Sequence, residues 1–297
     1  MPTPEPEKEW TIMSLQTWCT SYLKEKGFES ARLTTDLLLS HVLKCERIQL
    51  YAHFDKPLKK DELDTFRALF KRRLDQEPLQ YITGEAHFMS YAFNVDKRVL
   101  IPRPETEILV QEALDIIATD KDKSFQVLDI ATGSGNIAIS IAHGSPKIEI
   151  DAIDISPDAL SVAESNIKRH NVQDKVQLSK IDILNLTNGF PKSQYDVIVS
   201  NPPYISNSEF ILLSKDVKDY EPVVALKDNG DGLTFYKTIS KLGTKWLSPE
   251  GWILVEIAYN QSYDVKAIFE SDGYTNISII QDLERISRVV KAQKGVA

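Results

Sequence analysis

One short stretch of the sequence combines residue types that could hold a planar amino group. Residues 197–199 are apolar, as in a buried strand, and they run into Asn201, Pro202, Pro203 and Tyr204. Because proline has no N–H group, it cannot continue the ladder of a sheet, so Asn201 is expected at the strand's carboxyl end in a stiff backbone. An Asn oxygen, a free neighbouring carbonyl and an aromatic face suit an –NH2 group, which has two donors and can stack. An ordinary turn is the alternative interpretation.

A second candidate site follows an upstream apolar segment, residues 126–130. Gly133 and Gly135 would let the backbone approach a ligand closely, and Asp129 could accept hydrogen bonds from a ligand amine or from its own loop. Asp154 ends the next predicted strand, about 20 residues beyond Gly135. A carboxylate at that place suits ribose hydroxyls, so the pattern indicates an adenosine-containing cofactor.

Two cofactor classes fit this loop. Gly133, Gly135 and Ala138 have the spacing of a dinucleotide-binding fingerprint. A nicotinamide enzyme would also need a proton-transfer residue and a second nucleotide site, whereas S-adenosylmethionine needs neither and would pass its methyl group to a nitrogen held beside Asn201. The sequence therefore favours S-adenosylmethionine over NAD. Asp182, after the third predicted strand, could accept from the adenine amino group, although it could equally be an ordinary surface residue.

The candidate residues lie at strand ends in an alternating strand–helix pattern. We predict strands at residues 126–130, 148–153, 176–180, 195–200 and 252–257, helices at 137–142, 157–170, 233–246 and 261–271, and final strands at 277–280 and 287–291. This alternation predicts a mostly parallel sheet with helices on both faces and ligands at the carboxyl ends of its strands. Because no helix separates the last two strands, one of them is expected to be antiparallel.

The beginning of the chain has a different pattern. Residues 1–9 are rich in Pro and Glu, and we expect a disordered tail there. Apolar residues then recur at helical spacing within residues 14–27, 30–43 and 61–74. These stripes predict a small helical bundle over residues 10–80, with the stripes as its core.

A connection is expected between this bundle and a second domain. Residues 81–104 look extended or hairpin-like, and the second domain covers residues 105–297. Within residues 101–107, two prolines precede acidic residues that would favour the start of a helix. From the spacing alone, this segment is interpreted as a linker followed by a helix cap.

Composition and charge narrow the function classes. The 297 residues carry a formal net charge of −8, and residues 1–100 hold 15 basic and 15 acidic side chains, so the acidic excess lies in the remainder. Neither part has the basic footprint of a nucleic-acid-binding surface, which argues against nucleic acid as the main substrate. With no long apolar run and no apolar signal core, we expect a cytoplasmic protein that does not bind membranes. Cys19 and Cys45 lack metal-ligand spacing, so reduced thiols and no metal are expected.

Six segments resemble the release factor glutamine methyltransferase family. They are residues 101–107 (IPRPETE), 128–135 (LDIATGSG), 196–204 (DVIVSNPPY), 221–222 (EP), 230–233 (GDGL) and 288–290 (RVV). The resemblance covers nearly the whole chain. It implies an α/β fold with a Rossmann-like class I S-adenosylmethionine-dependent methyltransferase sheet, mostly parallel with an antiparallel strand near the C-terminus, and a small N-terminal helical bundle.

The resemblance also implies an activity. Members of this family are enzymes that use S-adenosyl-L-methionine to methylate the glutamine of the Gly-Gly-Gln motif in class I peptide chain release factors. The Asn-Pro-Pro-Tyr segment alone is shared with adenine-N6 and guanine-N2 nucleic-acid methyltransferases, which stay an alternative. Another alternative is a non-catalytic S-adenosylmethionine-binding docking protein of the translation machinery, against which the intact motif argues. A monomer is expected.

Roles for individual residues follow from the same resemblance. The Asn201 side chain and the Pro202 carbonyl would bind the substrate –NH2 and localise its lone pair, with Tyr204 packed on the amide plane and Pro203 beside it. The N-terminal bundle would grip the release factor away from this site. The implied cofactor-binding residues are Asp129, Ala131, Thr132, Gly133, Ser134, Gly135, Asp154, Asp182, Ile183 and Asn201.

Two cofactor residues depart from the family pattern. Ala131 stands where the family usually has Gly or Cys, and it is small enough that little loss is expected. Ile183 stands where related proteins often have an aromatic residue, so aliphatic contact would replace stacking on the adenine.

Overall fold

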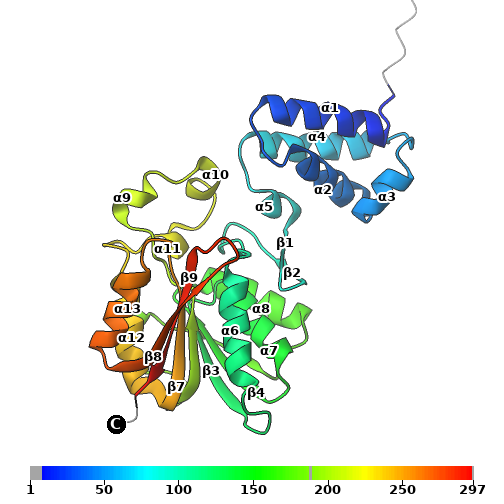
Figure 1. The fold of residues 1–297 in the computed structure, drawn as a ribbon. Coiled ribbons are helices and arrows are strands. Elements are labelled where there is room, and N and C mark those ends of the chain that lie inside the picture. Colours follow the sequence, from blue (N-terminus) through cyan, green and yellow to red (C-terminus); the bar gives the residue numbers. More distant parts are fainter. Residues whose placement is uncertain (1–8, 187–188, 296–297) are drawn as a thin grey trace, which may run out of the picture. The chain divides into compact units, whose positions relative to one another are not determined.

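The computed structural model describes residues 9–186 and 189–295 of the chain, which divides into two compact units, Met1–Gly84 and Glu85–Ala297. Both units are drawn in Figure 1. The tail expected to be disordered, residues 1–9, lies outside the described residues except for the exposed Glu9.

The N-terminal unit is built from helices (Figure 1). They are α1 (Ile12–Glu25), α2 (Ala31–Leu43), α3 (Arg47–Ala52), α4 (Lys60–Leu74) and α5 (Leu79–Thr83). Helix α1 begins with a capping box between Thr11 and Ser14. Gly27 follows its C-terminus with a positive φ of 82°, a conformation that glycine adopts most easily. The apolar stripes form the core of the unit, where Leu23 and Leu38 are fully buried.

The structure corrects the start of the expected connection. Residues Tyr81 and Ile82 belong to α5 and not to an extended segment, and the N–H groups of both bond to the Pro78 carbonyl. Both side chains are buried, and Gly84 ends the helix with a φ of 76°. A helix this short has too few turns for hydrophobic periodicity to reveal it; it is stabilised by burial of its apolar face.

The C-terminal unit contains the alternating elements. It begins with β1 (Glu85–Phe88), β2 (Tyr91–Asn94) and α6 (Thr106–Ile117), and continues with β3 (Phe125–Ile130), α7 (Asn136–Gly144), β4 (Ile148–Asp154), α8 (Pro157–Arg169), β5 (Val176–Lys180), β6 (Tyr195–Ser200), α9 (Asn207–Phe210), α10 (Lys215–Lys218), α11 (Val223–Leu226), α12 (Thr234–Trp246), β7 (Leu247–Glu256), α13 (Ser262–Ser271), β8 (Tyr274–Gln281) and β9 (Ser287–Lys294). The hairpin β1–β2 belongs to this unit and not to a linker.

The large sheet confirms the predicted topology. Its strand order is β5-β4-β3-β6-β7-β9-β8, and β9 pairs antiparallel with both of its neighbours while the strands from β5 to β7 are parallel. Helices α6, α7 and α8 cover one face and α12 and α13 the other (Figure 1). The order of strands reverses between β3 and β6, which is where ligands bind in open α/β sheets.

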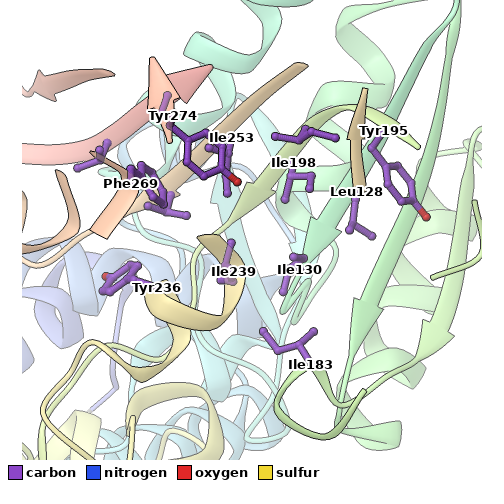
Figure 2. Packing of buried hydrophobic residues seen from close by; sticks show 14 of the residues in the cluster. Leu128, Ile130, Ile183, Tyr195, Ile198, Tyr236, Ile239, Ile253, Phe269 and Tyr274 are labelled. Atoms are coloured by element: carbon purple, nitrogen blue, oxygen red, sulfur yellow. The ribbon is translucent and has the colours of Figure 1, made fainter. Parts of the chain in front are cut away.

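Buried apolar side chains hold the strands of this switch point in register. Figure 2 shows Leu128, Ile130 and Ile198 of the central strands packed in one cluster with residues of α12 and α13 and with Ile183, which follows β5. Ile130 pairs with Ser200, and the Ser200 hydroxyl donates to the Ile130 carbonyl at 2.8 Å. The loops after β3 and β6 therefore begin side by side.

Candidate functional site

A cavity of about 200 Å³ opens at the carboxyl ends of β3, β4, β5 and β6. Most of the residues singled out in the sequence line it: Ala131, Thr132, Gly133, Ser134, Asp154, Asp182, Ile183, Asn201 and Pro203. Asp129, Gly135, Pro202 and Tyr204 do not line it. The strand ends thus bring together both groups of candidate residues, which are about 70 positions apart in the chain.

The loop after β3 is a tight turn that exposes its backbone to the cavity. Gly133 and Gly135 have φ values of 55° and 80°, which L side chains rarely adopt. A Cβ on Gly135 would lie 3.2 Å from Ile139 and 3.4 Å from Ala163, whereas a Cβ on Gly133 would meet nothing within 4 Å. Gly135 therefore permits close helix packing, and Gly133 leaves its backbone open to a ligand.

Ala131 is strained in this loop. Its φ is 61°, in the left-handed region that costs a non-glycine residue about 1–2 kcal/mol. The departure from Gly at this position was expected to matter little because alanine is small. The structure shows a cost in conformational free energy that side-chain size does not reveal, because this cost arises from the backbone conformation of Ala131.

Asp129 holds the loop from beneath. Its carboxylate is fully buried and accepts the Thr132 hydroxyl at 2.7 Å. Burial raises the pKa of Asp129 to about 7, and the bond from Thr132 opposes this rise. Of the two roles considered for Asp129, the structure shows the one inside the loop, and contact with a ligand amine stays a prediction.

Asp154 connects the loops after β3 and β4. One carboxylate oxygen accepts the Gly133 N–H and the other accepts the Ser156 N–H, both at 2.9 Å. Burial raises the pKa of Asp154, and these two backbone bonds counteract the shift. Each oxygen keeps a lone pair for a further donor, and the residue lines the cavity, so its carboxylate can accept from ligand hydroxyls.

The loop after β5 brings one polar and one apolar residue to the cavity. Asp182 accepts the Leu184 N–H at 2.9 Å and the Asn185 side-chain amide at 2.8 Å, and it caps the short 3-10 helix Ile183–Asn185. Ile183 is buried in the core cluster and also lines the cavity. Capping this helix is a sufficient reason for an Asp at position 182 even without a ligand. The Asp182 carboxylate keeps further lone pairs, so it can also accept a hydrogen bond from a ligand.

The loop after β6 is held by side chains from distant elements. Asn201 Nδ2 donates to Thr106 Oγ1 at 3.3 Å, and Gln261 Nε2 donates to the Tyr204 carbonyl at 3.1 Å. Gln261 also donates to the Gly232 carbonyl at 3.2 Å. Burial raises the pKa of Tyr204 above its usual value, and the charge of nearby Glu256 adds to that rise.

The spacing-based interpretation of residues 101–107 missed their place in the site. Pro102, Arg103 and Thr106 line the cavity, and Arg103 Nη2 donates to the buried carboxylate of Glu221 at 2.5 Å. This segment is therefore more than a linker and a cap. Its presence among the segments shared with a known family was the available signal, because hydrophobic periodicity says nothing about an ion pair with a residue 118 positions away.

Comparison with known proteins agrees with this geometry. Residues 106–216 match the family model described as "Methyltransferase small domain". The crystal structure of a methyltransferase from Pyrococcus furiosus has the same fold, with a TM-score of 0.50 and 16% identity, over 79% of this chain and 99% of that one. The C-terminal unit is a Rossmann-like, class I methyltransferase domain whose cofactor is S-adenosylmethionine.

The remaining comparisons are more specific. Residues 14–84 match the family model described as "PrmC N-terminal domain". Release factor glutamine methyltransferases of Geobacter sulfurreducens and Clostridium acetobutylicum are 40% and 39% identical to this chain. The alignments cover 96% and 93% of the chain and 98% and 95% of those proteins. The chain belongs to the release factor glutamine methyltransferase family, which confirms the resemblance seen in the sequence.

One further finding concerns the membrane. Among the described residues, none of the helices is both long and apolar enough to cross a bilayer.

Proposed function

We propose that this protein transfers the methyl group of S-adenosylmethionine to the side-chain amide nitrogen of the glutamine in the Gly-Gly-Gln motif of class I peptide chain release factors. The observation that carries the proposal is the position of Asn201, at the same cavity as the glycine loop and Asp154. An acceptor for an –NH2 group thus lies beside a site suited to an adenosine-containing methyl donor.

The residues at the cavity fit S-adenosylmethionine. The open Cα of Gly133 leaves room for a ligand against the backbone, and the Asp154 carboxylate has lone pairs for ribose hydroxyls. Ile155 and Ile183 supply apolar walls for a purine, with Asp182 as an acceptor for its amino group. When bound, the cofactor supplies an electrophilic methyl group: the N–C bond forms as the C–S bond breaks, leaving a neutral thioether, and the amide nitrogen releases one proton to water.

The residues after β6 prepare the nucleophile. An amide nitrogen is weakly nucleophilic because its lone pair is delocalised into the carbonyl. Hydrogen bonds from both of its N–H groups, to Asn201 Oδ1 and the Pro202 carbonyl, would localise the lone pair and direct it toward the methyl group, with Pro203 and Tyr204 fixing the amide plane. Catalysis then rests on positioning and oriented dipoles, without a strong general base.

A transfer assay tests this proposal. The protein is incubated with methyl-labelled S-adenosylmethionine and, separately, with purified release factors, DNA and rRNA. We expect label only in the release factor peptide that contains Gly-Gly-Gln. Label in nucleic acid would instead support the alternative methyltransferase class, and cofactor binding without any transfer would support a docking protein.

The N-terminal unit is proposed to bind the release factor. It contains a groove of about 300 Å³ lined by aromatic side chains, among them Trp18, Tyr22 and Phe70, with Arg67 and Lys71 beside them. The Trp18 ring stacks on Tyr22 with centroids 5.2 Å apart and is still 49% exposed, so the aromatic cluster presents an apolar face to a partner. Removing residues 1–84 is expected to spare cofactor binding and suppress methylation of intact release factor. An unchanged methylation rate would assign this unit another role.

The proposal also covers the setting in which the enzyme acts. Release factors work in the cytoplasm, so we place the enzyme there. We also propose that the enzyme is active as a monomer. Sedimentation of the active protein checks this point.

A further inference from the structure

We propose that Thr106 and Glu256 act as positioning residues that fix the orientation of the Asn201 side-chain amide, so that its oxygen and not its nitrogen faces the substrate. This inference rests on the proposed function, because it assigns the amide oxygen of Asn201 to the substrate –NH2. It concerns a chain of three side chains that come from three different elements.

The three side chains form a continuous hydrogen-bonded chain. Thr106, the first residue of α6, donates its hydroxyl to Glu256 Oε2 at 2.5 Å, and Asn201 Nδ2 donates to Thr106 Oγ1 at 3.3 Å. Glu256 ends β7, next to β6, and Ser200 pairs with Val255, so Asn201 and Glu256 follow paired residues. Thr106 and Glu256 are only 2% and 4% exposed, so water does not compete freely for these bonds.

The direction of these hydrogen bonds follows from the chemistry of Glu256. An ionised carboxylate can only accept hydrogen bonds, so the single hydroxyl proton of Thr106 must point to Glu256. The Thr106 oxygen is then left as an acceptor, which the NH2 group of Asn201 satisfies. An Asn amide turned by 180° would place two oxygens against each other in a buried site, and the lost bond would cost free energy.

Protonation of Glu256 would remove this constraint. A neutral carboxyl can donate to the Thr106 oxygen, which frees the hydroxyl proton to point at either end of the Asn201 amide. Burial raises the pKa of Glu256 to about 7. The Thr106 bond, Arg288 and Arg103 lower this pKa, and Glu105 raises it.

Two tyrosines complete the surroundings of Glu256. The hydroxyl of Tyr236 donates to the backbone carbonyl of Glu256 at 2.9 Å. Tyr204 lies close enough to Glu256 that the negative charge of Glu256 raises the pKa of Tyr204. Both phenols have pKa values raised by burial and stay neutral in the range where Glu256 ionises. The fixed orientation is therefore present above a pH of about 7 and is lost as the pH falls through that value.

The test compares Thr106→Val, which has the same shape without the hydroxyl, with Thr106→Ser, which keeps it. Single-turnover methylation of release factor by Thr106→Val should fall about tenfold to a hundredfold, the usual effect of removing a group that orients a functional residue. Thr106→Ser should retain most of the rate, and cofactor affinity should be kept in both variants. Thr106→Val should also melt at a lower temperature, because it leaves the buried Glu256 carboxylate without its hydroxyl donor, so the two rates are compared well below that temperature. The wild-type rate should also decline below pH 7, and the rate of Thr106→Val should not show this decline.

A second measurement is independent of activity. In protein labelled with 15N only at asparagine, the side-chain NH2 signal of Asn201, assigned by its loss in Asn201→Ala, should shift in Thr106→Val and at low pH. Wild-type rates in Thr106→Val, failure of Thr106→Ser to restore the rate, or an NH2 signal insensitive to Thr106 would each overturn the inference. If release factors are not methylated at all, the proposed function fails, while the NMR signal still decides the orientation of Asn201.

Discussion

The loops after β3 and β6 line the same cavity but are held in place in different ways. The β3 loop is fixed by carboxylates that are 3 and 21 positions away: Asp129 accepts from Thr132, and Asp154 at the end of the neighbouring strand accepts from Gly133. The β6 loop depends on Thr106, 95 positions away, and on Gln261, 57 positions away. The proposed cofactor side is therefore held by its own strand and the neighbouring one, whereas the proposed substrate side depends on more remote parts of the unit.

Asn201→Ala should have the largest effect, and it should be confined to the substrate side. The variant loses an acceptor for the glutamine amide, and removing one polar group that acts on a reacting centre typically costs about a hundredfold to a thousandfold in rate. Cofactor affinity, measured by calorimetry, should be nearly unchanged. A single-turnover rate close to that of the wild type would reject the role of Asn201.

Asn201→Asp sharpens the same comparison. The Asp side chain keeps an acceptor of similar size but has no NH2 group to donate to Thr106, and it places a negative charge next to the cofactor site. If the Asn201 oxygen is held in place by the bond from its NH2 group to Thr106, this variant should be nearly as slow as Asn201→Ala. Substantial single-turnover activity would show that an acceptor alone is enough.

Gln261→Ala should break the other remote support of the β6 loop. Gln261 Nε2 bonds the Tyr204 and Gly232 carbonyls, and its Oε1 accepts the Ala258 N–H at 3.1 Å. Buried groups left without partners should lower the free energy of unfolding by about 3 kcal/mol. Gln111→Ala is the matched control, since the exposed Gln111 side chain bonds to Asp115 on its own helix and its loss should change stability by less than about 0.5 kcal/mol. Equal stabilities of the two variants in urea titrations would contradict this account.

Asp154→Ala should affect the cofactor side alone. Loss of charge-assisted hydrogen bonds to ribose and of the bond to Gly133 should weaken S-adenosylmethionine binding by about 1–3 kcal/mol. Asp154→Asn keeps an acceptor oxygen without the charge and should lose less. Calorimetry decides the point, and unchanged affinity in the Ala variant would remove Asp154 from the ribose site.

Ala131→Gly should have the smallest effect of these variants, and it should raise the free energy of unfolding. Glycine relieves about 1–2 kcal/mol of left-handed strain at a φ of 61°, against an entropy cost of about 0.5–1 kcal/mol, so the protein should become about 0.5–1 kcal/mol more stable. Ala138→Gly, inside α7, is the control and should lower stability. A loss of stability in both variants would mean that the strain at Ala131 is relieved elsewhere.

The sequence predicted the parts of the site that depend on local pattern. Alternating apolar runs predicted the sheet and its antiparallel strand, and the positions of Asn201 and Asp154 at strand ends follow from the same runs. Parallel strands bring their carboxyl ends to one edge, so these residues were bound to share a site. Segments without a period, such as α5 with only Leu79–Thr83, were missed because a single helical turn has no repeat to detect.

Only the tertiary structure decided which side chains hold the reactive ones. Nothing near Thr106 in the sequence indicates that its hydroxyl reaches Glu256, 150 positions further on, because that contact requires the register of β6 with β7 and the packing of α6. Likewise, the pattern around Asp129 allowed it to face either a ligand or its own loop, and only the structure shows that its buried carboxylate accepts a bond from Thr132. Hydrophobic period and strand ends are local properties of a chain, whereas hydrogen bonds between strand ends become possible only after the sheet has formed.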